Sequence, residues 1–364
     1  MKIAIYGSSL LSSYWNGAAT YYRGILRALA SYGHAITFFE PDAYDRQSHR
    51  DIAPPSWCEV VVYPATETGL HDVLARAAAA DVVIKASGVG VYDEALLDGV
   101  VALSDPNALR IFWDVDAPAT LAEIAAAPDH YLRAVLPRLD TVLTYGGGNP
   151  VVELYRALGA PDCVPVYNGL DPETHHPVPS EDRYRADLTF LGNRLPDREQ
   201  RVADFFLSAA EQLSDRPMCL GGSGWEDKLC PPNVVKLGHV PTGDHNALNV
   251  SALAVLNISR DSMAATGFSP ATRIFEAAGA GACLLTDPWE GIDHFLAPGK
   301  EVLVVRDGAD VAEAVHSLTP LRAATIGLAA LRRVLAEHTY DQRAATLHAL
   351  LTRLTAKRRS ERAA

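Results

Sequence analysis

The chain has 364 residues, 48% of them hydrophobic, and its 32 basic and 44 acidic side chains give a formal net charge of −12. This acidic balance argues against a general nucleic-acid-binding protein, because contacts to phosphates dominate such affinity. The length and the apolar content are sufficient for two hydrophobic cores, so two domains are expected.

The cysteines and the apolar runs indicate where the protein works. The five cysteines are scattered and form no Cys-x-x-Cys pair, which argues against a disulfide framework and a zinc knuckle. The apolar run at the N-terminus is too short for a signal peptide, and no later run approaches the roughly 18 residues of a membrane helix. A cytoplasmic protein without an integral membrane segment is expected. The basic C-terminal end is expected to be solvated, with peripheral contact to an anionic surface as the alternative.

The first half alternates short apolar strands with helical stretches. This alternation predicts a parallel sheet covered by helices on both faces, whose ligands bind beyond the carboxyl ends of the strands. The expected strands cover residues 3–6, 35–39, 59–63, 81–85, 109–113, 141–143 and 164–167, and the expected helices cover residues 70–79, 93–97, 118–126 and 151–158.

The first strand runs into a loop with Gly7 and Ser8, and Asn16 and Gly17 precede the next helix. We interpret these four residues as an acceptor-side or diphosphate loop, because a glycine lets the backbone approach a ligand closely. Plain turn chemistry is the alternative. The loop lacks the Gly-x-Gly-x-x-Gly pattern of a dinucleotide site.

Turn-forming residues connect the two halves. Residues 1–168 are expected to form an N-terminal domain, residues 169–186 a linker, residues 187–335 a C-terminal domain, and residues 336–364 a terminal helix and a basic tail. His175 and His176 fall in the linker. Adjacent side chains point apart and nothing nearby in the sequence completes a ligand set, so a solvated pair is expected there and no metal site.

The second half repeats the α/β pattern and contains the segment with the clearest indication of chemistry. Its expected strands cover residues 188–191, 218–220, 234–237, 253–258, 282–286 and 302–305. Ser269 is a good N-cap and Pro270 suits the first helical position, so a helix is expected from there to the glycines at 279–281.

In this helix Thr272, Arg273 and Glu276 share one face. The free N–H groups of the first turn and the Arg273 guanidinium suit a diphosphate. The Glu276 carboxylate suits the vicinal hydroxyls of a ribose. An exposed Arg–Glu pair without a ligand is the alternative.

The order and spacing of several second-half motifs resemble the donor domain of GT-B glycosyltransferases, most closely the spore-maturation (CgeB-type) group. The resemblance covers roughly residues 188–306 and is looser in the first half. The matching motifs are Leu191-Gly192-Asn193-Arg194 with Pro196-Asp197-Arg198, Gly221-Gly222-Ser223-Gly224-Trp225, Leu256-Asn257-Ile258-Ser259-Arg260, and Ser269-Pro270 with Arg273, Phe275 and Glu276.

The resemblance implies two Rossmann-like domains facing a cleft, with a nucleotide-diphospho-sugar on the C-terminal domain (187–335) and the acceptor on the N-terminal domain (1–168). It also implies that the helix within residues 336–364 crosses back onto the first domain. It implies that Arg273 and the amides after Ser269 stabilise the departing diphosphate, with further cations nearby, and that Glu276 holds the ribose. Trp225 is expected either to stack on the base or to pack in the core. The donor-binding residues implied are Gly192, Asn193, Arg194, Arg198, Gly222, Trp225, Asn257, Arg260, Phe268, Ser269, Thr272, Arg273 and Glu276.

One position departs from the commoner retaining pattern of that superfamily. A second glutamate is expected eight residues before Glu276, and Phe268 stands there. The resemblance therefore does not predict the contacts to the donor sugar or the stereochemistry of transfer.

An inverting transfer needs a general base at the acceptor hydroxyl, and Asp114 and Asp116, at the end of an expected strand, are the candidates. Capping of the following helix is the alternative for Asp116. The two residues also form an Asp-x-Asp motif like that of metal-dependent transferases of another fold. The donor motifs of the second half favour transfer without a metal or other cofactor.

The leading hypothesis is thus an enzyme that moves a sugar from a nucleotide sugar to an unidentified acceptor. A nucleotide-sugar epimerase on the same two-domain plan and a non-catalytic nucleotide-sugar-binding protein are the alternatives.

Overall fold

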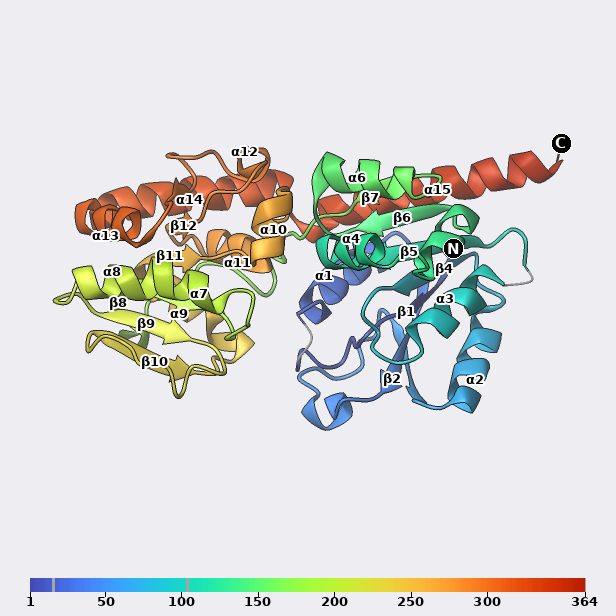
Figure 1. The fold of residues 1–364 in the computed structure, drawn as a ribbon, viewed down its shortest axis with the longest axis horizontal. Coiled ribbons are helices and arrows are strands. Elements are labelled where there is room, and N and C mark those ends of the chain that lie inside the picture. The colour runs from blue at the N-terminus through green and yellow to red at the C-terminus, as the bar shows by residue number, and fades with distance from the viewer. Residues whose placement is uncertain (15–16, 103–104, 364) are drawn as a thin grey trace. The chain divides into compact units, whose positions relative to one another are not determined.

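The computed structural model describes residues 1–14, 17–102 and 105–363. The chain forms two compact units, one made of Met1–Tyr167 with Tyr340–Ala364 and the other of Asn168–Thr339 (Figure 1). Residues 169–186, expected to be a linker, belong to the second unit. Among the described residues, none of the helices combines the length and the apolar character needed to cross a bilayer.

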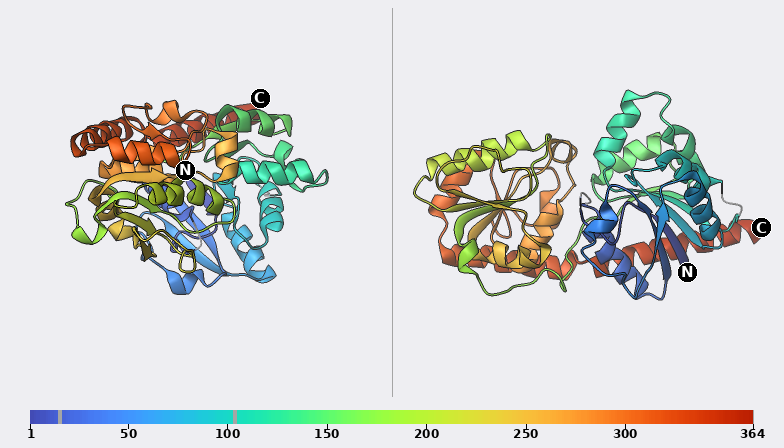
Figure 2. Two further views of the ribbon diagram at one scale, coloured as in Figure 1. Left: turned by 60° about the vertical axis from the view of Figure 1, so that its left-hand side comes forward. Right: turned by 90° about the horizontal axis from the view of Figure 1, so that it is seen from below.

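Unit 1 contains a parallel seven-stranded sheet in the order β3-β2-β1-β4-β5-β6-β7. The strands are β1 (Lys2–Tyr6), β2 (Ala35–Asp42), β3 (Glu59–Pro64), β4 (Val82–Ala86), β5 (Leu109–Asp114), β6 (Thr141–Thr144) and β7 (Cys163–Pro165). The central strands are buried along their length because helices cover both faces of the sheet (Figure 2).

The helices of unit 1 include one from the far end of the chain. They are α1 (Ala19–Ala30), α2 (Glu67–Ala77), α3 (Asp93–Val101), α4 (Ala117–Ala126), α5 (Leu132–Val135), α6 (Gly148–Ala157) and α15 (Tyr340–Ala363). Helix α15 packs on α1, and its buried residues Ala344, Leu347 and Leu351 join the core formed by β1, β4 and β5.

Unit 2 repeats this plan with six parallel strands in the order β10-β9-β8-β11-β12-β13. The strands are β8 (Ala186–Leu191), β9 (Met218–Gly221), β10 (Val234–Gly238), β11 (Ala252–Asn257), β12 (Leu284–Thr286) and β13 (Leu303–Val304). The helices are α7 (Glu199–Val202), α8 (Ser208–Gln212), α9 (His245–Ser251), α10 (Asp261–Thr266), α11 (Thr272–Ala280), α12 (Ile292–Phe295), α13 (Gly308–Ser317) and α14 (Pro320–Glu337). A π-helical turn at Ala203–Leu207 joins α7 and α8.

Helix α11 begins later than the sequence predicts. Its N-cap is Ala271, and the Ser269 hydroxyl donates to the Gly267 carbonyl (2.9 Å) instead of capping the helix. The reason lies upstream, where Gly267 and Phe268 both have positive φ and the Phe268 N–H donates to the Glu290 carbonyl (2.6 Å). The helix ends as expected, because Gly281 adopts the left-handed conformation after Ala280.

The α/β prediction with two parallel sheets is confirmed. Each sheet changes direction of winding once, between β1 and β4 in unit 1 and between β8 and β11 in unit 2. Ligands of doubly wound sheets bind outside the carboxyl ends of the strands at such points.

Candidate functional site

The candidate site of unit 2 begins with two loops that follow β8 and β9. Gly222 has a φ of +115°, and a Cβ on it would lie 2.2 Å from the Gly192 carbonyl oxygen, so only glycine fits there. The Asn193 side chain accepts a hydrogen bond from the Ser223 N–H (3.0 Å). The two loops are thereby joined at the carboxyl edge of the sheet.

Two of the predicted donor-binding residues are buried and form hydrogen bonds within the protein. Trp225 is 2% exposed, lies edge-on to Phe190 in the core, and donates its indole N–H to the Gly192 carbonyl (2.8 Å). Asn257, at the end of β11, is buried and donates to the Thr286 hydroxyl (3.0 Å). For Trp225 the surroundings favour the core-packing alternative.

The predicted cations fall into two groups. Arg194 lies 2.8 Å from both Glu199 and Asp227, so acidic neighbours already balance its charge. Arg198 lies near enough to Arg260 and Arg273 for their positive charges to act on it. Arg260 and Arg273 also each face a carboxylate, that of Asp197 and that of Glu276.

The surroundings of Arg198 make its positive charge less favourable. Burial lowers the pKa of Arg198 to about 10, with Asp197 opposing the shift and Arg273 and Arg260 adding to it. Among the described residues, Nε of Arg198 and both Nε and Nη1 of Arg273 are buried without a hydrogen-bond partner. Desolvated positive charge with unused donors is the arrangement that an anion stabilises.

The loop after β11 carries Arg260 and is held in place by a buried carboxylate. Asp287 is fully buried and accepts hydrogen bonds from the Ser259 N–H (3.0 Å) and hydroxyl (3.1 Å). Arg260 in turn lies 2.5 Å from Asp197 of the first loop. The arginine cluster therefore stands on the loops beyond β8 and β11, where the winding of the sheet reverses.

The first turn of α11 remains partly open: Thr272 and Arg273 are partly exposed, while Ser269 is buried. The Phe268 ring packs against Gly291, where a Cβ would lie 2.2 Å from Phe268 Cδ1. Phe268 thus anchors the loop that leads into the helix.

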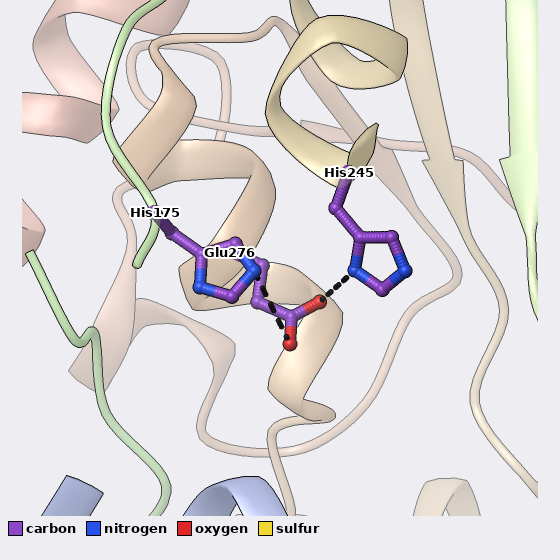
Figure 3. A group of neighbouring side chains, drawn as sticks. All are labelled: His175, His245 and Glu276. Atoms are coloured by element: carbon purple, nitrogen blue, oxygen red, sulfur yellow. Dashed lines mark ion pairs between the residues drawn. The ribbon is translucent and has the colours of Figure 1, made fainter. Parts of the chain in front are cut away.

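Glu276 lies one turn into α11 and is buried, with 7% of its surface exposed. Its neighbours are polar: Arg273 Nη1 is 3.0 Å from Oε2, and His175 Nε2 and His245 Nδ1 are 3.8 and 3.9 Å from the two carboxylate oxygens (Figure 3). Burial acts to raise the pKa of Glu276, but Arg273, followed by His175 and His245, outweighs it and lowers the pKa below its ordinary value. Burial also lowers the pKa of His245, to about 4, with Arg273 adding to the shift.

The prediction of a solvated pair at His175 and His176 is wrong for His175, which is 5% exposed, while His176 is exposed. Two contacts hold His175 beside the helix. Asn246, next to His245, donates to the Thr174 carbonyl (2.9 Å). Gly279 lets the chain pass closely over α11, since a Cβ there would lie 3.1 Å from the His175 carbonyl oxygen. Sequence analysis missed the group because 70 residues separate the histidines and no local pattern links them.

In unit 1 the two candidate bases differ in their surroundings. Asp114 is fully buried and accepts hydrogen bonds from the Tyr155 hydroxyl, the Asp116 N–H (3.0 Å) and the Thr120 hydroxyl (3.1 Å). Burial raises the pKa of Asp114, although these hydrogen bonds oppose the shift. Asp116 is partly exposed. Its backbone carbonyl accepts a hydrogen bond from the Ala119 N–H at the start of α4, and its side chain makes no capping hydrogen bond to that helix.

The loop after β1 is fixed by a residue that sequence analysis did not select. The buried Glu40 carboxylate accepts hydrogen bonds from the backbone N–H groups of Leu10 and Leu11. An acidic residue inside the apolar run of β2 was the available signal.

The predicted residues of this loop differ in their burial and contacts. A Cβ on Gly7 would lie 2.3 Å from the Phe38 ring. The backbone carbonyl of the buried Ser8 accepts a hydrogen bond from the Arg46 guanidinium (3.0 Å). Gly17 is exposed, and Asn16 lies outside the described residues.

Comparison with known proteins places the chain by fold and by part of its sequence. Residues 198–349 match the family model described as glycosyl transferase-like. A search of curated protein sequences found no match.

Several solved structures superimpose on nearly the whole chain. Sucrose-phosphate synthase from Thermosynechococcus elongatus does so with a TM-score of 0.70 and 15% identity, over 98% of this chain and 100% of that chain. Anabaena HepE in complex with UDP and glucose gives 0.68 and 14%, over 97% and 99%. An alpha-glucosyltransferase in complex with UDP-glucose and DNA containing an abasic site gives 0.70 and 12%, over 97% and 99%. The protein thus has the GT-B fold of two Rossmann-like units, and residues 198–349 are glycosyl transferase-like in sequence.

Proposed function

We propose that the protein is a glycosyltransferase that moves a hexose from a nucleotide-diphospho-sugar to an acceptor hydroxyl, without needing a metal for transfer. The observation that carries the proposal is that Arg198, on the loop beyond β8, and Arg273, at the start of α11, have buried guanidinium nitrogens without a hydrogen-bond partner among the described residues. Arg260, on the loop beyond β11, is near enough to Arg198 for its charge to act there. The glycosyl transferase-like match and structural neighbours solved with UDP or UDP-glucose support it, and UDP is the nucleotide we propose.

The roles follow from charge. In glycosyl transfer the sugar gains positive charge and the departing diphosphate gains negative charge, so cations placed in advance lower the barrier. Arg273 and Arg198 have unused buried donors that suit phosphate oxygens, and the first-turn amides of α11 add to them. Glu276 would accept hydrogen bonds from the ribose hydroxyls.

For the acceptor we propose Asp116 as the general base of an inverting transfer. It is partly exposed, whereas the hydrogen bonds around Asp114 occupy a buried carboxylate. We also propose that the protein belongs with the CgeB-type group, on the motifs from Gly192 to Glu276.

The test of donor binding is isothermal titration with a panel of nucleotide sugars. Replacing Arg273 by Ala should weaken binding about 10–100-fold, since a hydrogen bond to a charged group contributes about 1.5–3 kcal/mol. Arg306→Ala is the matched control, because Arg306 is 79% exposed and pairs only with its helix neighbour Asp310 in the described ion pairs. Equal affinity of the two variants would refute the assignment.

The test of the base is the rate of transfer. Asp116→Asn should lower kcat about 100-fold or more at unchanged donor affinity. An unaffected kcat would remove Asp116 from the mechanism and leave the donor site intact. Isomerised sugar in a reaction with the donor alone would instead point to an epimerase.

A further inference from the structure

We propose that His175, His245 and Glu276 bind a divalent cation of the zinc class, and that this cation and the nucleotide sugar exclude each other. The nearest potential ligand atoms of the three side chains all lie within 4.8 Å of one another. They come from three elements of unit 2: the segment after Asn168, the start of α9, and the second turn of α11 (Figure 3).

The hydrogen bonds around the histidines determine which ring nitrogens carry protons. His245 Nε2 lies 3.3 Å from the Val240 carbonyl oxygen, which can only accept, so the proton is on Nε2 and the lone pair on Nδ1. His175 Nδ1 lies 2.9 Å from the Thr174 hydroxyl, which itself donates to the Asp171 carbonyl (3.2 Å). The hydroxyl therefore accepts from Nδ1, and the lone pair of His175 is on Nε2.

Both lone pairs face the carboxylate of Glu276, which has no proton to give them while it is ionised. Among the described residues, His175 Nε2 and His245 Nδ1 are buried without a hydrogen-bond partner, and the His175 side chain is only 6% exposed. Unsatisfied polar atoms in such surroundings cost stability. A cation in the middle would satisfy the two nitrogens and the carboxylate together.

The ligand set selects the cation. Two imidazole nitrogens and one carboxylate oxygen, with a fourth position open, are a typical zinc set, whereas Mg²⁺ and Ca²⁺ prefer oxygen. Each histidine uses its other nitrogen for an oriented hydrogen bond, which is the usual support of a metal-binding imidazole. Tetrahedral zinc needs ligand atoms about 3.4 Å apart. The atoms here lie within 4.8 Å of one another, so the side chains must close in by up to about 1.4 Å.

Because of Arg273, binding of the cation and binding of the nucleotide sugar should oppose each other, a step that rests on the proposed function. Arg273 Nη1 lies 3.0 Å from Glu276 Oε2, at an angle that does not make a hydrogen bond. A divalent cation on Glu276 would repel this guanidinium and occupy the carboxylate that we assign to the ribose. Metal binding should therefore weaken donor binding, and donor binding should weaken metal binding by the same factor.

The experiment uses the full chain after treatment with a chelator. Zn²⁺ titration should show one ion per chain in the wild type, with affinity lowered at least about tenfold in His175→Gln and His245→Gln. His176→Gln is the matched control, since His176 is the exposed neighbour of His175, and its affinity should equal that of the wild type. No saturable binding, or the same affinity in all four proteins, would overturn the proposal.

A second measurement covers the case in which the histidine variants do not fold. The proton NMR spectrum of the wild-type Co²⁺ form should contain two paramagnetically shifted imidazole N–H resonances, one from each oriented ring. Their absence would refute ligation by both histidines.

Titration of Zn²⁺ in the presence of UDP tests the antagonism. The Kd for Zn²⁺, expressed in free Zn²⁺ after correction for the Zn²⁺ that UDP itself binds, should rise with UDP concentration. Metal binding that is indifferent to bound UDP would overturn the antagonism alone. If UDP does not bind at all while Zn²⁺ does, the proposed function fails and the metal site stands.

Discussion

Arg198 combines a charge, partial burial and an unused donor, so the anion binding that we propose for it and the stability of the free protein make opposite demands on this residue. A guanidinium whose pKa is lowered to about 10 by burial is less stable in the folded chain than in water. Residues of this kind are retained for what they bind.

We therefore expect Arg198→Met to leave the unfolding temperature of the free protein unchanged or higher, and to lower the affinity for UDP about tenfold or more. Thermal unfolding and calorimetry on the same samples measure both effects. Arg185→Met, at a side chain that is 76% exposed, should change neither. A destabilised Arg198→Met protein that still binds UDP normally would contradict this account.

Gly222 is the residue on which the two loops depend. Gly222→Ala should destabilise the protein by about 3 kcal/mol or more, because φ is +115° and the added Cβ would meet the Gly192 carbonyl at 2.2 Å. Gly243→Ala is the control, since nothing lies within 4 Å of a Cβ there. Equal unfolding midpoints in urea for the two variants would show that the loops do not touch as described.

At the level of elements, strands were easier to predict than the beginning of a helix. Strands such as β1 and β11 were placed to within one or two residues, because buried parallel strands are short apolar runs bounded by turn residues. Helix α11 was misplaced at its start because the positive φ of Phe268 depends on the contact with Glu290, a residue more than 20 positions away.

The same limit applies to the candidate site. Arg273 and Glu276 could be selected from the sequence since they share a helical face. The partners of Glu276 could not, because His175 and His245 meet it only after α9 and the segment behind Asn168 have packed on α11. Local spacing carries no information about such contacts.

The packing of α15 on α1 should be a large contribution to the stability of unit 1. Leu347 is fully buried in that core, so Leu347→Ala should cost about 2–5 kcal/mol. Leu328→Ala, at a position in α14 that is 49% exposed, should cost well under 1 kcal/mol. Denaturant unfolding monitored by circular dichroism measures both, and similar costs would mean that α15 is only loosely attached.

At the scale of the molecule, unit 2 is one continuous stretch and unit 1 is not. A fragment of residues 168–339 should therefore fold alone with a cooperative thermal transition. Residues 1–167 lack the apolar face of α15 and should remain molten until a peptide of residues 340–364 is added. A cooperative transition of residues 1–167 without that peptide would contradict the division.

Because unit 1 is made of two separate stretches of the chain, its last helix is synthesised late. During translation at about 5–20 residues per second, α15 begins to emerge roughly 9–35 s after the last strand of unit 1, once all of unit 2 has been made. The part of α1 that α15 covers in the folded protein lacks that cover during the interval. A chaperone can bind the nascent chain during this interval, and slower translation of the residues of unit 2 would lengthen the interval.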